Sequence, residues 1–544
     1  MSGPSRSPGS GTQPSRPCAR CTTRPTPASA HRVQRTSRAS TVPGFTQRQL
    51  LLVLGALIMA VMLASLDTTI VATALPTIAG EFNAFESFAW VGTAYIVTST
   101  IATPLLGKLS DLYGRRAIFQ TTMGIFLLGS ILCGLAQSMG QLIAFRAVQG
   151  VGGGAIQALA FSILGDILPP RERGRYIGYF TIAFAASALM GPLVGGFIID
   201  HFDWPWIFYI NVPFCIVVGL VCHRALRLPF PRRDARLDFV GAALLSGGLA
   251  CLMIGLEQGG EGWTETSTLV LFGAALVLLS AFVVQEHRAD EPMIPPHLFR
   301  NPVVLASVAI GFFAGAVTYG TNQFLPLYFQ DSLFVSPTES GLRLMPMMIG
   351  VSATSFVVGR LIARSGGYRR YPIVGSMFGV VGVVAITTID GSTRYITLVV
   401  PMALMGIAMG CMFTSTSIAT QNAVEFRDLG VATATVMFFR SLGGSIVLAG
   451  SGSTLNATIR HEIPRRTNVA ADEAAGLIRA PDQIQALPAG TRAAVIDSIA
   501  LGVSRIYWIA AGLMLVAVVS ALLLPERPLR SRAGISDAME SASA

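Results

Sequence analysis

Long apolar stretches, each about as long as a membrane span, follow one another along most of the chain, and short polar connections separate them. A helix needs about 20 largely apolar residues to cross a bilayer. Fourteen stretches meet this length, at residues 50–75, 88–107, 116–137, 141–166, 174–199, 205–223, 237–257, 267–285, 303–326, 340–363, 372–390, 395–417, 431–452 and 503–524. The pattern predicts an all-α polytopic membrane protein.

The composition points to lipid as the main solvent of these stretches. Of the 544 residues, 52% are hydrophobic and 12% are charged, with a mean hydropathy of +0.59. Soluble domains carry about 25% charged residues. The composition therefore excludes a disordered chain and argues against an ordinary soluble enzyme.

The net charge of +10 could suggest nucleic acid, but most of it lies in residues 1–48. This segment holds eight arginines and no acidic residue, with many Pro, Ser, Thr and Gly. We expect a disordered basic tail, although transit peptides share this composition. Its Cys18 and Cys21 make one CxxC pair, half of what a zinc site needs. No nucleic acid, metal or cofactor is expected.

Charge alternates between the connections and so predicts an orientation. Arg115, Arg173 and Arg370 belong to basic even-numbered connections, whereas Glu86 and Asp203 belong to acidic odd-numbered ones. Short cytoplasmic connections carry the excess of Lys and Arg, which places both termini in the cytoplasm. Lys108 is the only lysine and no Walker A motif surrounds it. Arg far outnumbers Lys, which suggests a GC-rich genome and the inner (plasma) membrane of a bacterium.

Residues 359–370 are a degenerate repeat of residues 107–116, and both stretches are rich in Gly and Arg. Each lies after the second span of its half if spans 7 and 8 are an insert. Two similar six-span bundles around a central site are typical of secondary transporters. The predicted organisation is 6 + 2 + 6, with a tail at 1–48, bundles at 49–223 and 301–525, an insert at 224–300, a long extracellular loop at about 453–502 and a tail at 526–544.

Several motifs carry a family resemblance. Gly107 to Arg116 resembles the G-x-L-a-D-r-x-G-r-k signature of the major facilitator superfamily. Stretches similar to its fourteen-span drug:proton antiporter branch lie at residues 66–76, 146–153, 191–196 and 438–444. The chain departs from that pattern with Ala72, Ser187 and Pro205. The resemblance covers about residues 50–525 and implies the major facilitator fold with 14 transmembrane helices.

Asp67 and Arg146 are the strongest site candidates, because an ionisable group inside a span marks function by default. Counted along their spans, both lie at a similar depth and could pair. Low dielectric raises the pKa of an unpaired carboxyl, and a nearby guanidinium lowers it. A switch between these environments would carry a proton. The alternative is a static buried pair.

The resemblance also implies two conformational elements. A gate between the bundle halves would use Gly107, Asp111, Gly114, Arg115 and Arg116, with Asp166 as a partner; the arginines could instead only orient the chain. An antiporter motif comprising Gly191, Pro192, Gly195 and Gly196 would seal against proton leak. Tight helix packing explains small residues equally well.

A few further polar residues inside the predicted spans could contact the substrate or support the structure: Asn322, Gln323, Gln421, Asn422 and Arg440. The expected function is a proton-coupled antiporter that exports amphipathic small molecules by alternating access, with the lipid bilayer, a lipophilic substrate and protons as partners; a monomer is compatible with it. A dedicated exporter of a natural product, siderophore or lipid, a facilitator-type importer and a non-transporting sensor remain alternatives. The sequence shows no arrangement of catalytic residues that would indicate an enzyme.

Overall fold

The computed structural model describes residues 46–82, 88–226, 238–259, 263–391, 393–425, 428–467, 469 and 481–529, which form helices and no strand. The predicted tail up to residue 45, with Cys18 and Cys21, lies outside the described residues, as do residues 227–237 and 530–544. The predictions made for these segments stay predictions.

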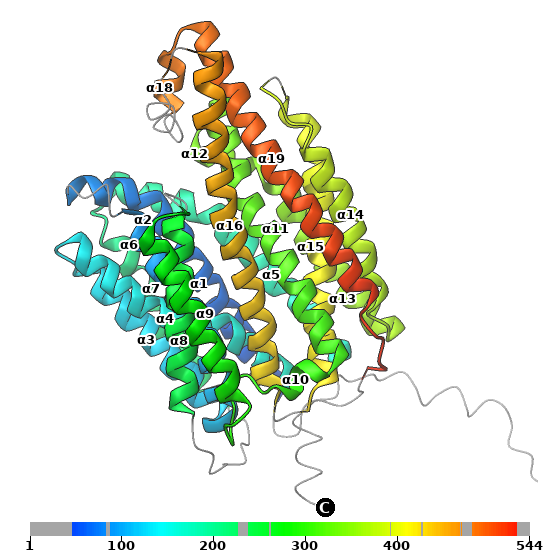
Figure 1. Ribbon diagram of the computed structural model, residues 1–544. Helices are drawn as coiled ribbons and strands as arrows, with labels where there is room; N and C mark the ends of the chain where they lie inside the picture. The colour runs from blue at the N-terminus through cyan, green and yellow to red at the C-terminus, as the bar shows by residue number, and fades with distance from the viewer. Residues whose placement is uncertain are drawn as a thin grey trace, which may run out of the picture.

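The first half of the chain forms one helical bundle (Figure 1). Its helices are α1 (Gln47–Glu81), α2 (Phe88–Tyr113), α3 (Arg115–Gly134), α4 (Met139–Ile167), α5 (Pro170–His201), the short α6 (Trp206–Tyr209) and α7 (Asn211–Ala225). α1 begins with a capping box, in which the side chains of Thr46 and Gln49 satisfy free backbone groups. Gly114, between α2 and α3, has a φ of 97°, which favours glycine.

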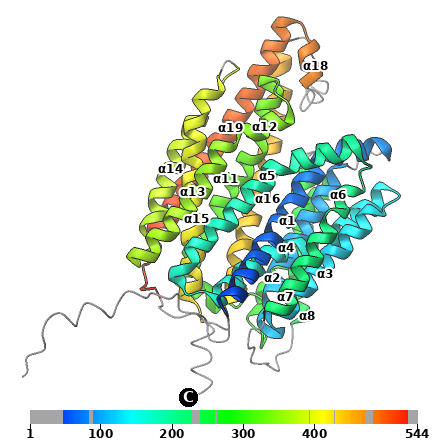
Figure 2. The same cartoon turned by 180° about the vertical axis from the view of Figure 1, so that it is seen from behind.

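The second bundle contains α10 (His297–Arg300), α11 (Pro302–Leu333), α12 (Pro337–Arg343), α13 (Met345–Ser365), α14 (Arg370–Ile386), α15 (Tyr395–Ala423), α16 (Leu429–Arg466), α18 (Pro481–Ala486) and α19 (Ala489–Leu522). Two helices follow the first bundle in the chain and precede the second, α8 (Phe239–Gly259) and α9 (Thr266–Glu286). They pair with each other, and α8 contacts α2 and α16. On the opposite side, α5 of the first bundle packs on α13 of the second (Figure 2).

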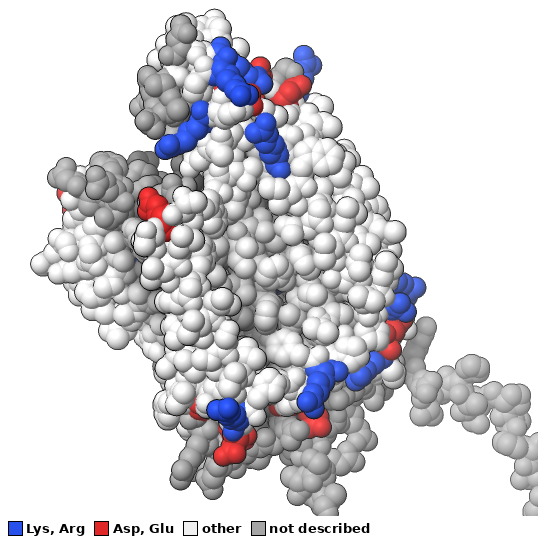
Figure 3. Space-filling model, in the orientation of Figure 1, with Lys and Arg blue, Asp and Glu red and all other residues white. Residues whose placement is uncertain are grey.

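Eleven of the described helices are long and apolar enough to cross a membrane, and α14 is a shorter apolar helix. Large apolar side chains are exposed on their outer faces, for example Leu276, Ile396 and Trp508. On the face shown in Figure 3, lysine, arginine, aspartate and glutamate gather toward the two ends of the molecule, with an uncharged band between them. Such a band suits a protein whose sides face lipid.

The long loop predicted at 453–502 is largely helical. α16 continues to Arg466, and α19 already begins at Ala489, so both helices extend beyond the others at the top of Figure 1. Ile459, Ile463 and Ile499 pack together there in a small apolar cluster. Polar and charged residues between these isoleucines lower the mean hydropathy, which hid the helical spacing of the apolar positions.

The two ends of the molecule differ in charge. We call the end at which α1 begins and α2 ends the basic end, because Lys108, Arg115 and Arg173 lie there, and we call the opposite end the far end. Lys108 is buried and its Nζ lies 2.9 Å from Oε2 of Glu291, which precedes α10. This ion pair attaches the chain leaving α9 to the first bundle.

Candidate functional site

Asp67 of α1 and Arg146 of α4 form a buried ion pair inside the first bundle. Nη1 of Arg146 donates to Oδ2 of Asp67 at 2.6 Å, and the two residues are 1% and 2% exposed. A buried pair is stable only when further hydrogen bonds satisfy both groups. The helices around the pair supply such bonds to Asp67 and to Nη1 of Arg146, whereas the buried Nε of Arg146 has no hydrogen-bond partner among the described residues.

Amide side chains complete the coordination of the carboxylate. Gln149 Nε2 and Asn211 Nδ2 both donate to Oδ1 of Asp67, at 2.7 and 2.8 Å. Both amides also donate to the hydroxyl of Ser130, and Gln149 Oε1 accepts from Arg146. Asp67 thus accepts one charged and two neutral donors from α4 and α7. Nothing in the sequence distinguishes the three neutral residues as partners of the pair, because uncharged polar residues in spans are common and none of the three is marked by its spacing.

Tyr95 of α2 lies between this pair and the centre of the molecule. The guanidinium carbon of Arg146 lies 4.3 Å from the centre of the Tyr95 ring, within cation–π distance. A Cβ at Gly153 of α4 would overlap the Tyr95 hydroxyl, and one at Gly150 would overlap its backbone. Glycines in α4 therefore let α2 approach closely enough for this ring to cover Arg146.

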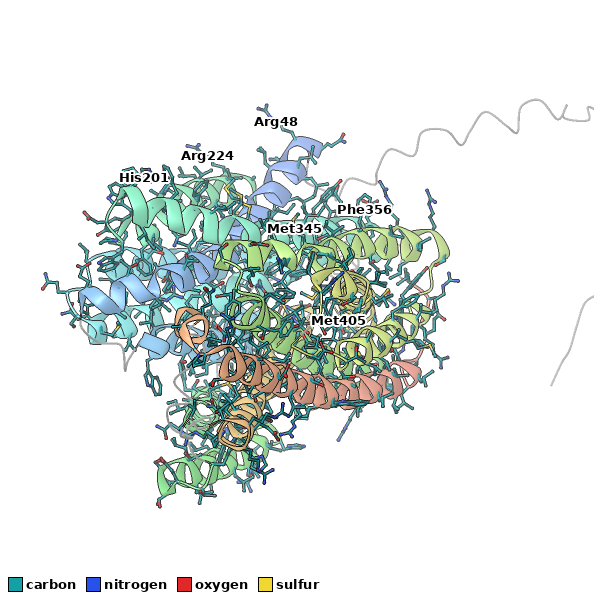
Figure 4. The ribbon with its side chains drawn as sticks, turned by 90° about the horizontal axis from the view of Figure 1, so that it is seen from above. Arg48, His201, Arg224, Met345, Phe356 and Met405 are labelled. Carbon is teal, nitrogen blue, oxygen red and sulfur yellow. The ribbon has the colours of Figure 1, made fainter. Side chains whose placement is uncertain are left out.

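A cavity of about 530 Å³ lies between the two bundles, and Tyr95 is part of its wall. Its volume falls in the range that holds small-molecule ligands. Aromatic, methionine and hydroxyl side chains from α1, α2, α4, α5, α11, α13, α15 and α16 line it. Figure 4, which looks down the bundles, shows Met345 and Phe356 on α13 and Met405 on α15. Asp67 itself is not part of the cavity wall, whereas Tyr95, whose ring covers Arg146, is.

Asp111, Arg115 and Asp166 meet at the basic end. Arg115 forms ion pairs with Asp111 and Asp166, and its Nε lies 2.7 Å from Oδ2 of Asp166. Oδ2 of Asp111 also accepts the backbone N–H of Val431 in α16 at 2.7 Å. The cluster therefore bonds the first bundle to the first turn of α16, where the positive end of the helix dipole favours a carboxylate. Arg116 is partly exposed beside it.

Arg173 makes a second connection at the basic end. It is 1% exposed, and its guanidinium donates to the carbonyl oxygens of Leu168 and Gly165 and, at 3.1 Å, to Gln421 Oε1 of α15. Gln421 Nε2 in turn donates to the Phe161 carbonyl of α4. From the sequence Arg173 looked like one more orienting arginine, and nothing in its spacing distinguishes it.

Glycines allow the bundles to touch at the same end. A Cβ on Gly174 of α5 would overlap the backbone of Gly359 in α13, and the reverse holds too. A Cβ on Gly107 of α2 would overlap Ala434 of α16. Gly107 and Gly359 are the first residues of the two repeated stretches, 107–116 and 359–370. The internal repeat therefore corresponds to two equivalent contacts between the bundles.

The 191–196 motif packs within the first bundle. A Cβ at Gly191 would overlap Thr69, and one at Gly195 would overlap Thr73, both in α1. Ser187, one turn earlier, donates to the Met62 carbonyl at 2.8 Å. Pro192 lies in the same helix, and Gly196 faces open space. The motif thus holds α5 against the α1 turn that follows Asp67.

The remaining polar candidates separate into two groups. Arg440 and Asn322 line the cavity. Gln421 lies between the bundles at the basic end, and Asn422 donates to the Pro528 carbonyl, so both are away from the cavity wall. Gln323 is exposed and is not part of that wall either. Within the described ranges, no three His, Cys, Asp or Glu residues come together as a metal site would require.

Replacing Asp111 by alanine is expected to loosen the basic end. The carboxylate accepts a backbone N–H and pairs with Arg115, and a charge-assisted bond contributes about 1.5–3 kcal/mol. Ala434 is buried at this contact, so a cysteine placed there in a background without native cysteines reports opening. We expect its alkylation by N-ethylmaleimide to rise about tenfold. The exposed Asp203→Asn is the control, and an unchanged alkylation rate for Asp111→Ala would contradict a latch.

Comparisons with known proteins agree with this architecture. A family model described as the Major Facilitator Superfamily matches residues 57–448. The multidrug transporter protein MdtP of Bacillus subtilis (strain 168) is 34% identical over 416 residues, 76% of each chain. Multidrug resistance protein 3 of the same organism is 33% identical over 456 residues, covering 81% of this chain and 87% of that protein. Among solved structures, the proton:xylose symporter XylE superposes with a TM-score of 0.59 at 13% identity, over 91% of this chain and all of that one.

Proposed function

Because the chain belongs to the major facilitator superfamily and is therefore a membrane transporter and not an enzyme, we propose that it exports amphipathic small molecules in exchange for protons. The observation that carries this proposal is the buried Asp67–Arg146 pair beside the central cavity. The pair places an ionisable carboxylate inside a membrane helix, and the Tyr95 ring that covers Arg146 is part of the cavity wall.

The coordination of Asp67 supports the proposed proton exchange. Arg146 and two amides bond to the carboxylate in this conformation. A rearrangement of α1 against α4 that separates the carboxylate from Arg146 would leave it in low dielectric, where the neutral acid is favoured. Proton uptake and release would then accompany the change of conformation, with the proton gradient as the energy source and no cofactor.

The topology proposed is fourteen spans arranged as 6 + 2 + 6. α2, α5 and α14 would complete the eleven candidate spans, with α6 and α7 acting as one span and α8 and α9 as the insert. Basic residues concentrate where α1 begins, and the positive-inside rule therefore assigns this end to the cytoplasm. In a bacterium the chain would lie in the inner membrane with both termini cytoplasmic.

Alternating access would use the contacts at the basic end as the inner gate. The Asp111–Arg115–Asp166 cluster and the Gly174–Gly359 contact hold the bundles together there. The structure would correspond to a form closed to the cytoplasm. The α1–α5 packing at Gly191 and Gly195 would keep the wall around Asp67 tight against proton leak.

The proposed substrate class is amphipathic. Two relatives at 33–34% identity are named for multidrug transport or resistance, and this supports export of lipophilic compounds. Met347, Met409 and Phe413 are among the residues that line the cavity. Methionine and aromatic surfaces adapt to varied apolar ligands, and neighbouring hydroxyl groups can bind polar substituents.

Accumulation measurements test the proposal. Cells that produce the protein are loaded with a panel of lipophilic dyes and antibiotics, with and without a protonophore, and compared with cells carrying an empty vector. We expect lower accumulation of some compounds, abolished by the protonophore. Export that persists when the proton gradient has collapsed would refute proton coupling, and unchanged accumulation of every compound would refute multidrug export.

A further inference from the structure

Arg440 of α16 is a cation in the wall of the central cavity. Its guanidinium carbon lies 4.9 Å from the centre of the Phe413 ring of α15. No hydrogen bond or ion pair joins its side chain to any other residue in the part of the chain that the structure describes. A charged group at this depth in a membrane protein is costly unless it meets an opposite charge or water. No opposite charge for this arginine lies among the described residues, and the cavity is the space from which a ligand could supply one.

The rest of the cavity wall does not supply an opposite charge. Among the described residues that line the cavity, Arg440 is the only charged one, and none is Asp, Glu, His or Lys. The nearby Asp67 is outside the wall and is already neutralised by Arg146. The charges facing a bound molecule therefore sum to a positive potential, which strengthens as the dielectric falls.

The wall also contains residues whose hydroxyl groups have no hydrogen-bond partner. Ser352, Ser417 and Thr420 are wall residues, and their buried hydroxyl oxygens have no hydrogen-bond partner among the described residues. A hydroxyl donates one hydrogen bond and can rotate to reach a ligand. The guanidinium binds carboxylates in a bidentate manner, and it can therefore hold a carboxylate or sulfonate. The hydroxyls would add further donors once their side chains rotate toward the cavity.

Apolar side chains complete the ligand space. Met409, Phe413 and Met437 approach from the second bundle, and Phe161 and Phe184 approach from the first. A cavity of about 530 Å³ accommodates a ligand of small-drug size. The wall thus combines one cation, serine and threonine residues and an adaptable apolar surface.

We propose that the cavity binds amphipathic monoanions, with the acidic group on Arg440 and the apolar body among the methionine and phenylalanine side chains. This specificity rests on the proposed transport function and narrows its substrate class. The same positive charge disfavours lipophilic cations, because a second cation in a low-dielectric cavity is repelled.

A binding experiment with three related probes tests the specificity apart from transport. Dansylglycine is an anion, dansylglycinamide is neutral and dansylcadaverine is a cation, and all share one fluorescent body. Binding to the full-length protein purified in detergent is followed by the rise in dansyl fluorescence at neutral pH. We expect the protein to bind dansylglycine at least about tenfold more tightly than dansylcadaverine, which corresponds to about 1.4 kcal/mol.

Substitutions at Arg440 then assign the preference. Arg440→Gln is expected to remove the preference for dansylglycine while binding of dansylglycinamide stays within about twofold, because only the charge is lost. Arg440→Lys should keep part of the preference for dansylglycine, and this result would show that the site still folds when Arg440 is replaced. Arg288→Gln, an exposed arginine at the end of α9, is the matched control.

The outcomes separate this inference from the transport proposal. Equal or tighter binding of the cation, no binding of the anion, or a preference that survives Arg440→Gln would overturn the anion site. Arg440-dependent binding of dansylglycine without protonophore-sensitive export in cells would keep the anion site and refute the transport mechanism.

Discussion

Replacing Asp67 by asparagine is expected to abolish transport driven by a proton gradient. Asparagine keeps the size of the side chain and can still bond to Gln149 and Asn211, but it cannot take up and release a proton. It also leaves Arg146 buried without a counter-charge, and breaking such a pair costs about 3–5 kcal/mol. We expect substrate uptake into inside-out vesicles under an imposed pH gradient to fall by about a hundredfold or more.

A second substitution separates proton coupling from structural support. In Asp67→Asn with Arg146→Gln, both charges are absent, so the thermal stability of the purified protein should recover relative to Asp67→Asn alone. Coupled uptake should remain absent, because no titratable group replaces the carboxylate. The exposed Asp203→Asn serves as the control. Normal coupled uptake by the double variant would identify the pair as purely structural.

Replacing Gly359 by leucine is expected to have a comparably large effect by a different route. A Cβ at this position overlaps the backbone of Gly174, so α5 and α13 cannot approach at the basic end. Backbone atoms cannot move aside as a flexible side chain can. The form closed at the basic end becomes inaccessible, and we expect transport to fall to the level of empty vesicles.

The position of the bundles supplies the second measurement for this variant. A cysteine at Ala434, on the α2–α16 contact, should react with N-ethylmaleimide at its unhindered rate in Gly359→Leu. Gly124→Leu is the matched control, because a Cβ on Gly124 in α3 meets no atom within 4 Å. Gly174→Leu should reproduce the Gly359→Leu result from the other bundle. Transport at the unmodified level would mean that closure at this contact is not part of the cycle.

The sequence located the central ion pair because charges inside apolar stretches are rare. Asp67 and Arg146 could be recognised one by one, and helical rise placed them at similar depth. Their neutral partners could not be recognised, since Gln149, Ser130 and Asn211 belong to three helices that only folding brings together. The same limit applies to Arg173, which looks ordinary in the sequence and meets Gln421 across the bundles. Gln421 was recognised as a polar residue inside a span, but its partner was not.

Hydropathy predicted the helices where they face lipid. It did not predict the parts of α16 and α19 that extend beyond the apolar band. The predicted spans 431–452 and 503–524 lie within α16 and α19, but both helices continue into the region predicted as a loop. There the isoleucines bury one another rather than face lipid, so a narrow apolar stripe is sufficient. An average over about 20 residues does not detect such a stripe.

The sequence by itself determined the membrane character, the helical class, the family motifs and the rare intramembrane charges, because lipid imposes apolar length and penalises every charge. Only the tertiary structure decided which polar groups meet. It placed the Tyr95 ring over Arg146 in the cavity wall, and Asp111 at the first turn of α16. It also left Arg440 as a cation in the cavity wall. These contacts depend on the relative rotation and depth of helices distant in the chain, which no local pattern of residues encodes.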